Sequence, residues 1–277
     1  MRFTKMQGIG NDFVFINCFE EDVPDPSRLA IQMCRPHYGI GADGLVLIEP
    51  ADGADAGMRI FNSDGSESEM CGNAVRCIGK YMYERGLTDK TELSLLTKGG
   101  IRRLWMTVED DQVAWVKVDM GSPELSPRRI PVDLPGEMVL KHRLQMMGQT
   151  LFVTCVNMGN PHAVIFVRDP EVVDLPVLGP MIEHHPLFPR RTNVEFVRVI
   201  KRDVLQMRVW ERGAGETLAC GTGACAALVA GVLTGVCDRN VQMKLSGGNL
   251  SLQWNAADNN VYMSGDASFV FDGYWVD

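Results

Sequence analysis

The stretches MRIFNSDGSESEMCG (58–72) and MRVWERGAGETLACG (207–221) lie 149 residues apart in the chain and resemble each other. Five of their fifteen positions are identical (Met, Arg, Glu, Cys and Gly), where ordinary composition gives about one by chance. The same offset pairs three residues further out, namely Asn11 with Asn160, Gly99 with Gly248 and Trp105 with Trp254. A match that keeps one offset over about a hundred residues indicates that one α+β unit was duplicated.

Each half of the chain reads as several short strands and one apolar helix. The helix of the first half is expected to begin just after Cys71 and to end at Arg85, because Gly86 follows, and its counterpart spans 221–233. Another helix is expected to run from Ser27, as its N-cap, to Cys34. Because strands dominate and each central helix is hydrophobic enough to be enclosed, we expect an α+β fold. It would contain two similar domains, each a mixed or antiparallel β-sheet wrapped around a central helix.

The domain boundaries follow from the repeat. A length of 277 residues fits two medium-sized domains, and we expect them over 1–120 and 121–265. The Pro-rich stretch 121–137 is the expected inter-domain linker. The last strand, 266–277, is expected to return to the first domain.

Composition excludes several classes of protein. A hydrophobic content of 45% and a charged content of 22% are ordinary globular values. The net charge of −8 disfavours nucleic acid and anionic membranes as partners. Eight cysteines are too few for a disulfide scaffold, and no signal peptide is visible at the start, so we expect a cytoplasmic protein with reduced thiols. The uncharged stretch 217–237 consists mainly of small residues, which predicts a buried helix and not a membrane span.

The two repeated cysteines, Cys71 and Cys220, each precede a glycine and an expected helix. A helix N-terminus carries free N–H groups and a partial positive charge, which favours a thiolate and can hold a carboxylate. Two such thiols would allow one to remove a proton beside a carboxylate while the other returns a proton from the opposite face, without a cofactor. The alternative is that both cysteines are inert core residues.

Five motifs along the chain belong together. They are KMQGIGNDF (5–13), FNSDGSESEMCGNAVRC (61–77), MGNPH (158–162), ERGAGETLACGTGAC (211–225) and FDGYW (271–275). With these motifs in this order, the sequence resembles the diaminopimelate epimerase family. The resemblance spans essentially the whole chain. It implies a pyridoxal-independent enzyme that interconverts LL- and meso-diaminopimelate in lysine and peptidoglycan precursor synthesis. It also implies a homodimer of two-domain subunits and no metal.

The resemblance carries specific roles onto this sequence. It makes Cys71 and Cys220 the two acid/base residues, and Gly72-Asn73 and Gly221-Thr222 the holders of the reacting carboxylate. The remaining substrate-binding residues that it implies are Asn11, Asn62, Asn160, Asn193, Glu211 and Arg212. His162 and Glu211 are implied to tune the pKa values of the cysteines. Residue types agree, because a substrate that is zwitterionic at both ends needs a guanidinium, a carboxylate and amides.

Simpler interpretations remain for some of these residues. Asn62 and Asn160 also suit turns, and His162 could be a satisfied structural histidine. Arg59 and Arg208 lie within strand patterns and Cys77 and Cys225 on the helices, so we expect these four to be structural. The family pattern is also broken twice: Gly44 stands where some members have a substrate-contacting glutamine, and Phe271 where many have an interface tyrosine.

Three other functions stay open. A two-cysteine racemase of proline, hydroxyproline or another amino acid would keep the architecture, although Glu211-Arg212 suits a second charged end of the substrate. A thiol-redox or zinc protein is disfavoured because the sequence contains no C-x-x-C. A non-catalytic amino-acid binding module would bind substrate without proton exchange.

Overall fold

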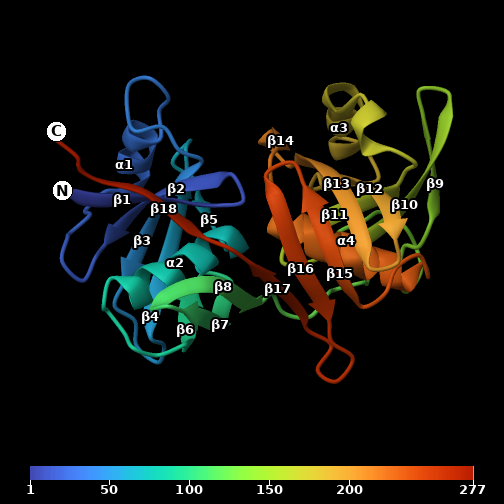
Figure 1. Ribbon diagram of the computed structural model, residues 1–277. Coiled ribbons are helices and arrows are strands. Elements are labelled where there is room, and N and C mark those ends of the chain that lie inside the picture. The colour runs from blue at the N-terminus through green and yellow to red at the C-terminus, as the bar shows by residue number, and fades with distance from the viewer. Residues whose placement is uncertain (277) are drawn as a thin grey trace. The chain divides into compact units, whose positions relative to one another are not determined.

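The computed structural model describes residues 1–276 and divides into two compact units (Figure 1). Unit 1 contains Met1–Asp119 and the chain from Ser264 onward, and unit 2 contains Met120–Met263. Each unit is a mixed sheet packed against a central helix, so the fold is α+β. The predicted fold class is confirmed.

Unit 1 holds its sheet around helix α2. Its strands pair in the order β18–β1–β2–β3–β4–β6–β7–β8, with β5 on β4; the β2–β3 and β4–β6 pairs are parallel and the others antiparallel. Helix α2 contacts β1, β7 and β8. The elements are β1 (Arg2–Gly8), β2 (Asn11–Asn17), α1 (Pro26–Met33), β3 (Gly44–Glu49), β4 (Ala56–Asn62), β5 (Glu67–Ser68), α2 (Gly72–Glu84), β6 (Glu92–Thr97), β7 (Gly100–Glu109), β8 (Gln112–Asp119) and β18 (Ser268–Tyr274).

Unit 2 repeats this arrangement around helix α4. Its strands pair in the order β9–β10–β11–β12–β13–β15–β16, with β14 on β13; the β11–β12 and β13–β15 pairs are parallel and the others antiparallel. Helix α4 contacts β10, β11, β12 and β16. The elements are β9 (His142–Met146), β10 (Gln149–Asn157), β11 (Pro161–Phe166), a 3-10 turn (Pro170–Val172), α3 (Leu175–Glu183), β12 (Asn193–Lys201), β13 (Val204–Glu211), β14 (Gly215–Thr217), α4 (Gly221–Leu233), β15 (Asn240–Leu245) and β16 (Gly248–Trp254). Strand β17 (Val261–Gly265) begins in unit 2 and ends in unit 1.

The offset of 149 residues aligns the two units element by element. Helix α2 begins at Gly72 and α4 at Gly221, and each has thirteen residues. An ion pair is repeated at the same offset: Arg59 Nε donates to Glu67 Oε1 at 2.8 Å, and Arg208 Nε donates to Glu216 Oε1 at 2.9 Å. These arginines stabilise the β4–β5 and β13–β14 hairpins, which confirms that they are structural.

The central helices supply much of each core. Ala224 to Ala230 on α4 are buried without exception, as the uncharged stretch 217–237 predicted. Cys77 on α2 and Cys225 on α4 have 0% exposure, so both are core residues. Within residues 1–276, no helix is long and apolar enough to cross a membrane. Gly86 follows α2 with a φ of +71°, a left-handed conformation that ends a helix and favours glycine.

Three local predictions were wrong or incomplete. Asp25, not Ser27, caps α1: its side chain accepts from Arg28 N, while the Ser27 hydroxyl donates to Gly65 O. The expected linker 121–137 packs onto unit 2, because Ile130 and Val132 are buried in its hydrophobic core. Helix α3 was not predicted, since Pro180 lies in the helix interior, where proline argues against a helix.

Candidate active site

Cys71 and Cys220 occupy the same structural position in their units. Each is the N-cap residue of its helix, with extended backbone angles (φ −138°, ψ 115° and φ −121°, ψ 107°). The residues that follow, Gly72-Asn73 and Gly221-Thr222, form the first helical turns, where backbone N–H groups lack intrahelical acceptors. Both thiols therefore lie beside a group of N–H donors that suits a carboxylate.

In unit 1 the surroundings of Cys71 are built from amides. The Cys71 thiol donates to Asn11 Oδ1 at 3.6 Å, and Asn73 Nδ2 donates to the same oxygen at 3.0 Å. Asn11 Nδ2 donates in turn to Asp43 Oδ2 at 2.5 Å, and that oxygen also accepts from Asp12 N at 3.0 Å. Asp43 thus fixes which side of the Asn11 amide faces the thiol. Burial raises the pKa of the Asp43 carboxyl.

Asp43 was missed by the sequence analysis. It lies between motifs in the stretch GADG, where an aspartate reads as turn chemistry. Asn73 has a further feature of interest: its Oδ1 is buried and has no hydrogen-bond partner within residues 1–276. A buried acceptor without a partner is costly in a folded protein, and a ligand that donates a hydrogen bond would satisfy it.

Two further positions of unit 1 lie at the ends of strands. Asn62 ends β4, is exposed, and donates from Nδ2 to Ser66 Oγ at 2.9 Å, so the structure places it in the turn before β5. Gly44 begins β3, and a Cβ built there would lie 2.6 Å from Phe61 O. The glutamine that some family members carry at this position therefore does not fit this backbone without a shift.

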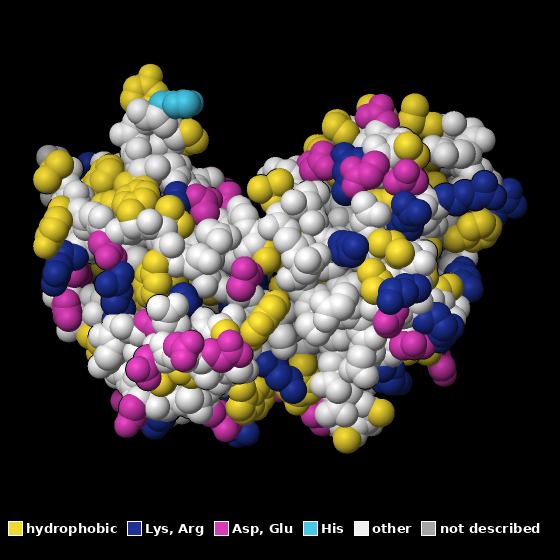
Figure 2. All heavy atoms as spheres, viewed as in Figure 1, with side chains coloured by type: hydrophobic (Ala, Val, Ile, Leu, Met, Phe, Trp, Pro, Cys, Tyr) yellow, Lys and Arg dark blue, Asp and Glu magenta, His cyan; other side chains and the backbone are white. Residues whose placement is uncertain are grey.

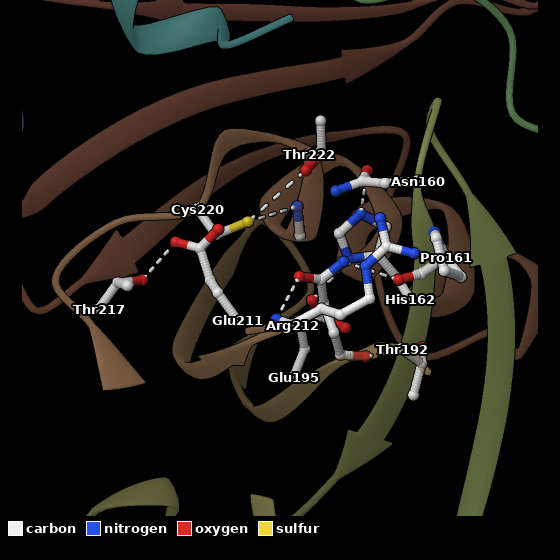
Figure 3. Close-up of polar contacts among 12 residues, drawn as sticks. Asn160, Pro161, His162, Thr192, Glu195, Glu211, Arg212, Thr217, Cys220 and Thr222 are labelled. Atoms are coloured by element: carbon white, nitrogen blue, oxygen red, sulfur yellow. Dashed lines mark hydrogen bonds and ion pairs between the residues drawn. The ribbon is translucent and has the colours of Figure 1, made fainter. Parts of the chain in front are cut away.

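In unit 2 the surroundings of Cys220 are ionisable (Figure 3). The Cys220 sulfur accepts from Gly223 N at 3.4 Å and lies 3.5 Å from Thr222 Oγ1. Glu211 at the end of β13 accepts from Thr217 Oγ1 at 2.5 Å and lies close enough to Cys220 to affect the pKa of its thiol. Burial raises the pKa of Glu211, although its hydrogen bonds with Thr217 and Cys220 and the charge of His162 oppose this.

At Cys220 the effect of the helix N-terminus on the pKa is outweighed by burial and by nearby carboxylates. Burial is the largest cause and raises this pKa well above its ordinary value, and the carboxylates of Glu211 and Glu195 raise it further. Hydrogen bonds from Thr222 and Gly223 N oppose the change but are weaker. The expectation of a thiolate at this helix start was therefore wrong for Cys220, because the residue is only 4% exposed and two carboxylates raise the pKa of its thiol further.

His162 lies beneath this site with no exposed surface. Its Nε2 is 2.8 Å from Asn160 Oδ1, and its Nδ1 is 2.7 Å from Glu195 Oε1, which is also fully buried. Oxygen atoms face both ring nitrogens, so the ring orientation is fixed from two sides. Glu195 was missed by the sequence analysis, although the repeat offered a signal: at the offset of 149 it aligns with the apolar Val46.

Asn193 and Arg212 form a separate part of the site. Asn193 Nδ2 donates to Pro161 O at 2.8 Å, and its Oδ1 accepts from Arg212 N at 2.9 Å. Asn193 therefore holds the backbone at Arg212. The Arg212 side chain is exposed and donates to Arg190 O at 3.3 Å, which leaves donors of its guanidinium available to a carboxylate.

Unit 1 thus brings together Cys71, Asn11 and Asn73, with Asn62 apart in its turn. Unit 2 brings together the other predicted residues that contact one another, namely Asn160, His162, Glu211, Cys220 and Thr222, with Asn193 beside Arg212. In the part of the chain that the structure describes, no group of three or more His, Cys, Asp or Glu residues is arranged to hold a metal ion.

Known proteins match this chain over nearly its whole length. The family model described as diaminopimelate epimerase matches residues 3–126 and 154–270. A diaminopimelate epimerase of Acetivibrio thermocellus is 56% identical over 273 residues, covering 99% of this chain and 98% of that protein. One of Desulfovibrio desulfuricans is 53% identical over 279 residues, covering 99% and 97%.

A solved structure shows the same fold at low sequence identity. The structure of a probable proline racemase from Agrobacterium radiobacter superimposes with a TM-score of 0.75 at 14% identity, covering 99% of this chain and 92% of that one. Such a likeness concerns the fold alone. The matched family model and the two relatives, together with duplicated helices that each start at a cysteine, show that this chain belongs to the diaminopimelate epimerase family.

Proposed function

We propose that this enzyme interconverts LL- and meso-diaminopimelate by proton transfer at one α-carbon, with Cys71 and Cys220 as the two acid/base residues and no cofactor. The observation that carries the proposal is the position of the two thiols. Each is the N-cap of an equivalent helix, in a chain of this family. One sulfur, as thiolate, takes the α-proton; the other, as thiol, gives its proton to the opposite face. The enzyme ends with one thiol and one thiolate, as it began.

The first helical turns supply the electrostatic part of the reaction. As the α-proton leaves, negative charge spreads onto the substrate carboxylate, and free N–H groups at Gly72-Asn73 and Gly221-Thr222 are suited to stabilise it. Asn11 orients the Cys71 thiol through its Oδ1. This division of labour needs no group beyond the chain's own residues.

Charged residues near Cys220 have distinct roles. Glu211 accepts a hydrogen bond from Thr217 and places negative charge near Cys220, so we assign it to the reacting end of the substrate and not to the distal ammonium. Arg212 is exposed and suits the distal carboxylate. Asn160 and Asn193 position His162 and the Arg212 backbone, respectively.

Proton NMR of LL-diaminopimelate in D2O, with reduced enzyme and no pyridoxal phosphate, tests the reaction. Loss of the α-proton signal with formation of meso product is expected. Cys71→Ser and Cys220→Ser should each abolish epimerisation, and full activity in either variant would refute the two-base assignment. A panel including proline and hydroxyproline is the control for substrate: exchange with those alone would keep the mechanism and replace the substrate.

We also propose that the enzyme is a cytoplasmic homodimer and that its domains are 1–120, completed by the returning C-terminal strand, and 121–265. Val270, Phe271 and Tyr274 on β18 are exposed by 54%, 47% and 71%. Hydrophobic side chains gather over the β1–β18 region on the visible face (Figure 2), which suits contact with a second copy. Sedimentation analysis of the wild type and Phe271→Asp tests this, with a shift toward monomer expected in the variant.

A further inference from the structure

The two units differ at three positions that contact one another in unit 2. At the offset of 149, His162 corresponds to Phe13, Glu195 to Val46 and Gly223 to Ala74. All three residues of unit 1 are apolar and buried. Unit 2 therefore carries an ionisable pair and a glycine where unit 1 carries an apolar cluster, so the duplicated cysteines have chemically different surroundings.

Glu195 is held by strand geometry beneath the start of α4. It lies on β12, which pairs in parallel with β11, the strand that carries His162. Glu195 Oε1 lies 2.7 Å from His162 Nδ1, and both side chains have 0% exposure. Its second oxygen, Oε2, is buried with no hydrogen-bond partner among residues 1–276. A buried carboxylate with one oxygen unsatisfied is costly, and a role in the site would account for its presence.

Because Gly223 has no side chain, it leaves room for the Glu195 carboxylate beside the Cys220 sulfur. A Cβ at Gly223 would lie 2.7 Å from Glu195 Oε1 and 3.2 Å from Cys220 Sγ. Both atoms thus lie where the methyl group of an alanine at position 223 would crowd them. In unit 1 the corresponding Ala74 is tolerated beside Val46, which has no carboxylate.

Several ionisable or polar groups face Cys220 and Glu195. Glu211 on β13 and Glu195 on β12 place negative charge near the Cys220 sulfur, whereas Thr222 and Gly223 N stabilise its anion. Glu195 in turn faces His162 on β11 and Cys155 on β10. Burial is the main cause that raises the pKa of the Cys155 thiol, and the charge of Glu195 raises it further. Negative charge beside a buried sulfur favours the protonated thiol.

We infer that Glu195 is a positioning residue for Cys220: it orients His162 beneath the site and keeps the Cys220 sulfur in its thiol form, so that unit 2 rests as the proton donor while Cys71 rests as the base. The inference deepens the proposed function and depends on it for the roles of donor and base. The charge effect on Cys220 is a property of the free enzyme and can be measured without substrate.

Peptide-resolved alkylation by iodoacetamide between pH 6 and 12, quantified by mass spectrometry on the full-length protein, tests the inference. The pH midpoint of each alkylation profile reports the pKa of that thiol and does not depend on how fast the reagent reaches the sulfur. In the wild type, the midpoint of Cys220 should lie above that of Cys71. In Glu195→Gln, which keeps an oxygen acceptor for His162 but loses the charge, the midpoint of Cys220 should fall. At a fixed pH below both midpoints, Cys220 of the variant should be alkylated about tenfold faster than Cys220 of the wild type, because a midpoint lowered by about one pH unit gives about ten times more thiolate.

The matched control is Glu183→Gln. Glu183 is another buried carboxylate of unit 2, but it accepts from Trp210 Nε1 at 2.8 Å and Gly213 N at 3.0 Å and is not among the charges that raise the pKa of Cys220. This variant should leave the Cys220 midpoint unchanged.

A Glu195→Gln profile that superimposes on the wild-type profile would overturn the inference. A wild-type Cys220 midpoint at or below that of Cys71 would also overturn it. This second comparison uses the wild type alone, so it does not depend on whether the variant folds. Absence of α-proton exchange with LL-diaminopimelate would refute the proposed function instead, and would leave the alkylation result standing.

Discussion

Adding a methyl group at Gly223 should destabilise unit 2 by crowding Glu195 and Cys220. The built Cβ lies 2.7 Å from Glu195 Oε1, a carboxylate oxygen that His162 holds at 2.7 Å from the other side. Overpacking of this kind costs about 1–3 kcal/mol, and alanine recovers up to about 1 kcal/mol of helix propensity over glycine. We therefore expect Gly223→Ala to lose about 1–2 kcal/mol and, by displacing the sulfur, to reduce activity.

Unit 1 indicates how this loss is relieved. Its own residues at these positions are Ala74 and Val46, so replacing the glycine and the glutamate together copies a solution that the chain already contains. In a double-mutant cycle, Gly223→Ala should cost less in the Glu195→Val background than in the wild type, with a coupling of about 1–3 kcal/mol for residues in contact.

Thermal unfolding followed by calorimetry provides the measurement. A loss of 1 kcal/mol lowers Tm by about 2–4 °C for a unit of this size, so Gly223→Ala should melt about 2–8 °C below the wild type. Ala74→Gly is the control for helix propensity alone. If the two single changes add to within about 0.5 kcal/mol, the crowding argument fails.

Three other outcomes are expected. Asp43→Ala should lower kcat/KM about 5–150-fold, the equivalent of 1–3 kcal/mol, because Asn11 loses the acceptor that orients its amide; unchanged kinetics would contradict this role. Gly44→Gln should lower Tm and not improve activity, because its Cβ would lie 2.6 Å from a backbone oxygen; a normal Tm would show that β3 adapts. Lys90 holds the pKa of Asp55 to about 2, below its ordinary 3.8, so this stabilisation is present above about pH 4 and lost as pH falls toward 2. In Asp55→Asn, the free energy of unfolding should fall less steeply between about pH 4 and pH 2 than in the wild type. A steeper fall in the variant would contradict the prediction.

The repeat made the central part of the fold predictable from sequence. Matching Cys-Gly pairs placed both helix starts, and the small residues after Cys220 predicted a buried α4. Helix α1 was also predicted, but Ser27 and Asp25 are both good caps, and only the folded chain commits the Ser27 hydroxyl to Gly65 O.

Glu195 was hidden because a single glutamate in a strand reads as a solvent-facing residue. Strand β12 pairs on both sides, with β11 and β13, and its first five residues are buried. The raised pKa of Cys220 was missed for a related reason: a helix N-terminus is visible in sequence, whereas carboxylates from β12 and β13 reach the sulfur only through tertiary packing. Comparing the halves for polar residues opposite apolar ones would have found Glu195.

The pairing of β18 with β1 has a consequence for the order of events on the ribosome. Unit 2 is one continuous segment, whereas unit 1 takes its strand beside β1 from Ser268–Tyr274, which are synthesised after all of unit 2. Domains ordinarily fold as they emerge, the N-terminal one first. Here the edge of β1 that pairs with β18 stays open in the nascent first unit until β18 is synthesised. The half of the enzyme that is translated first is therefore the half whose sheet is completed last.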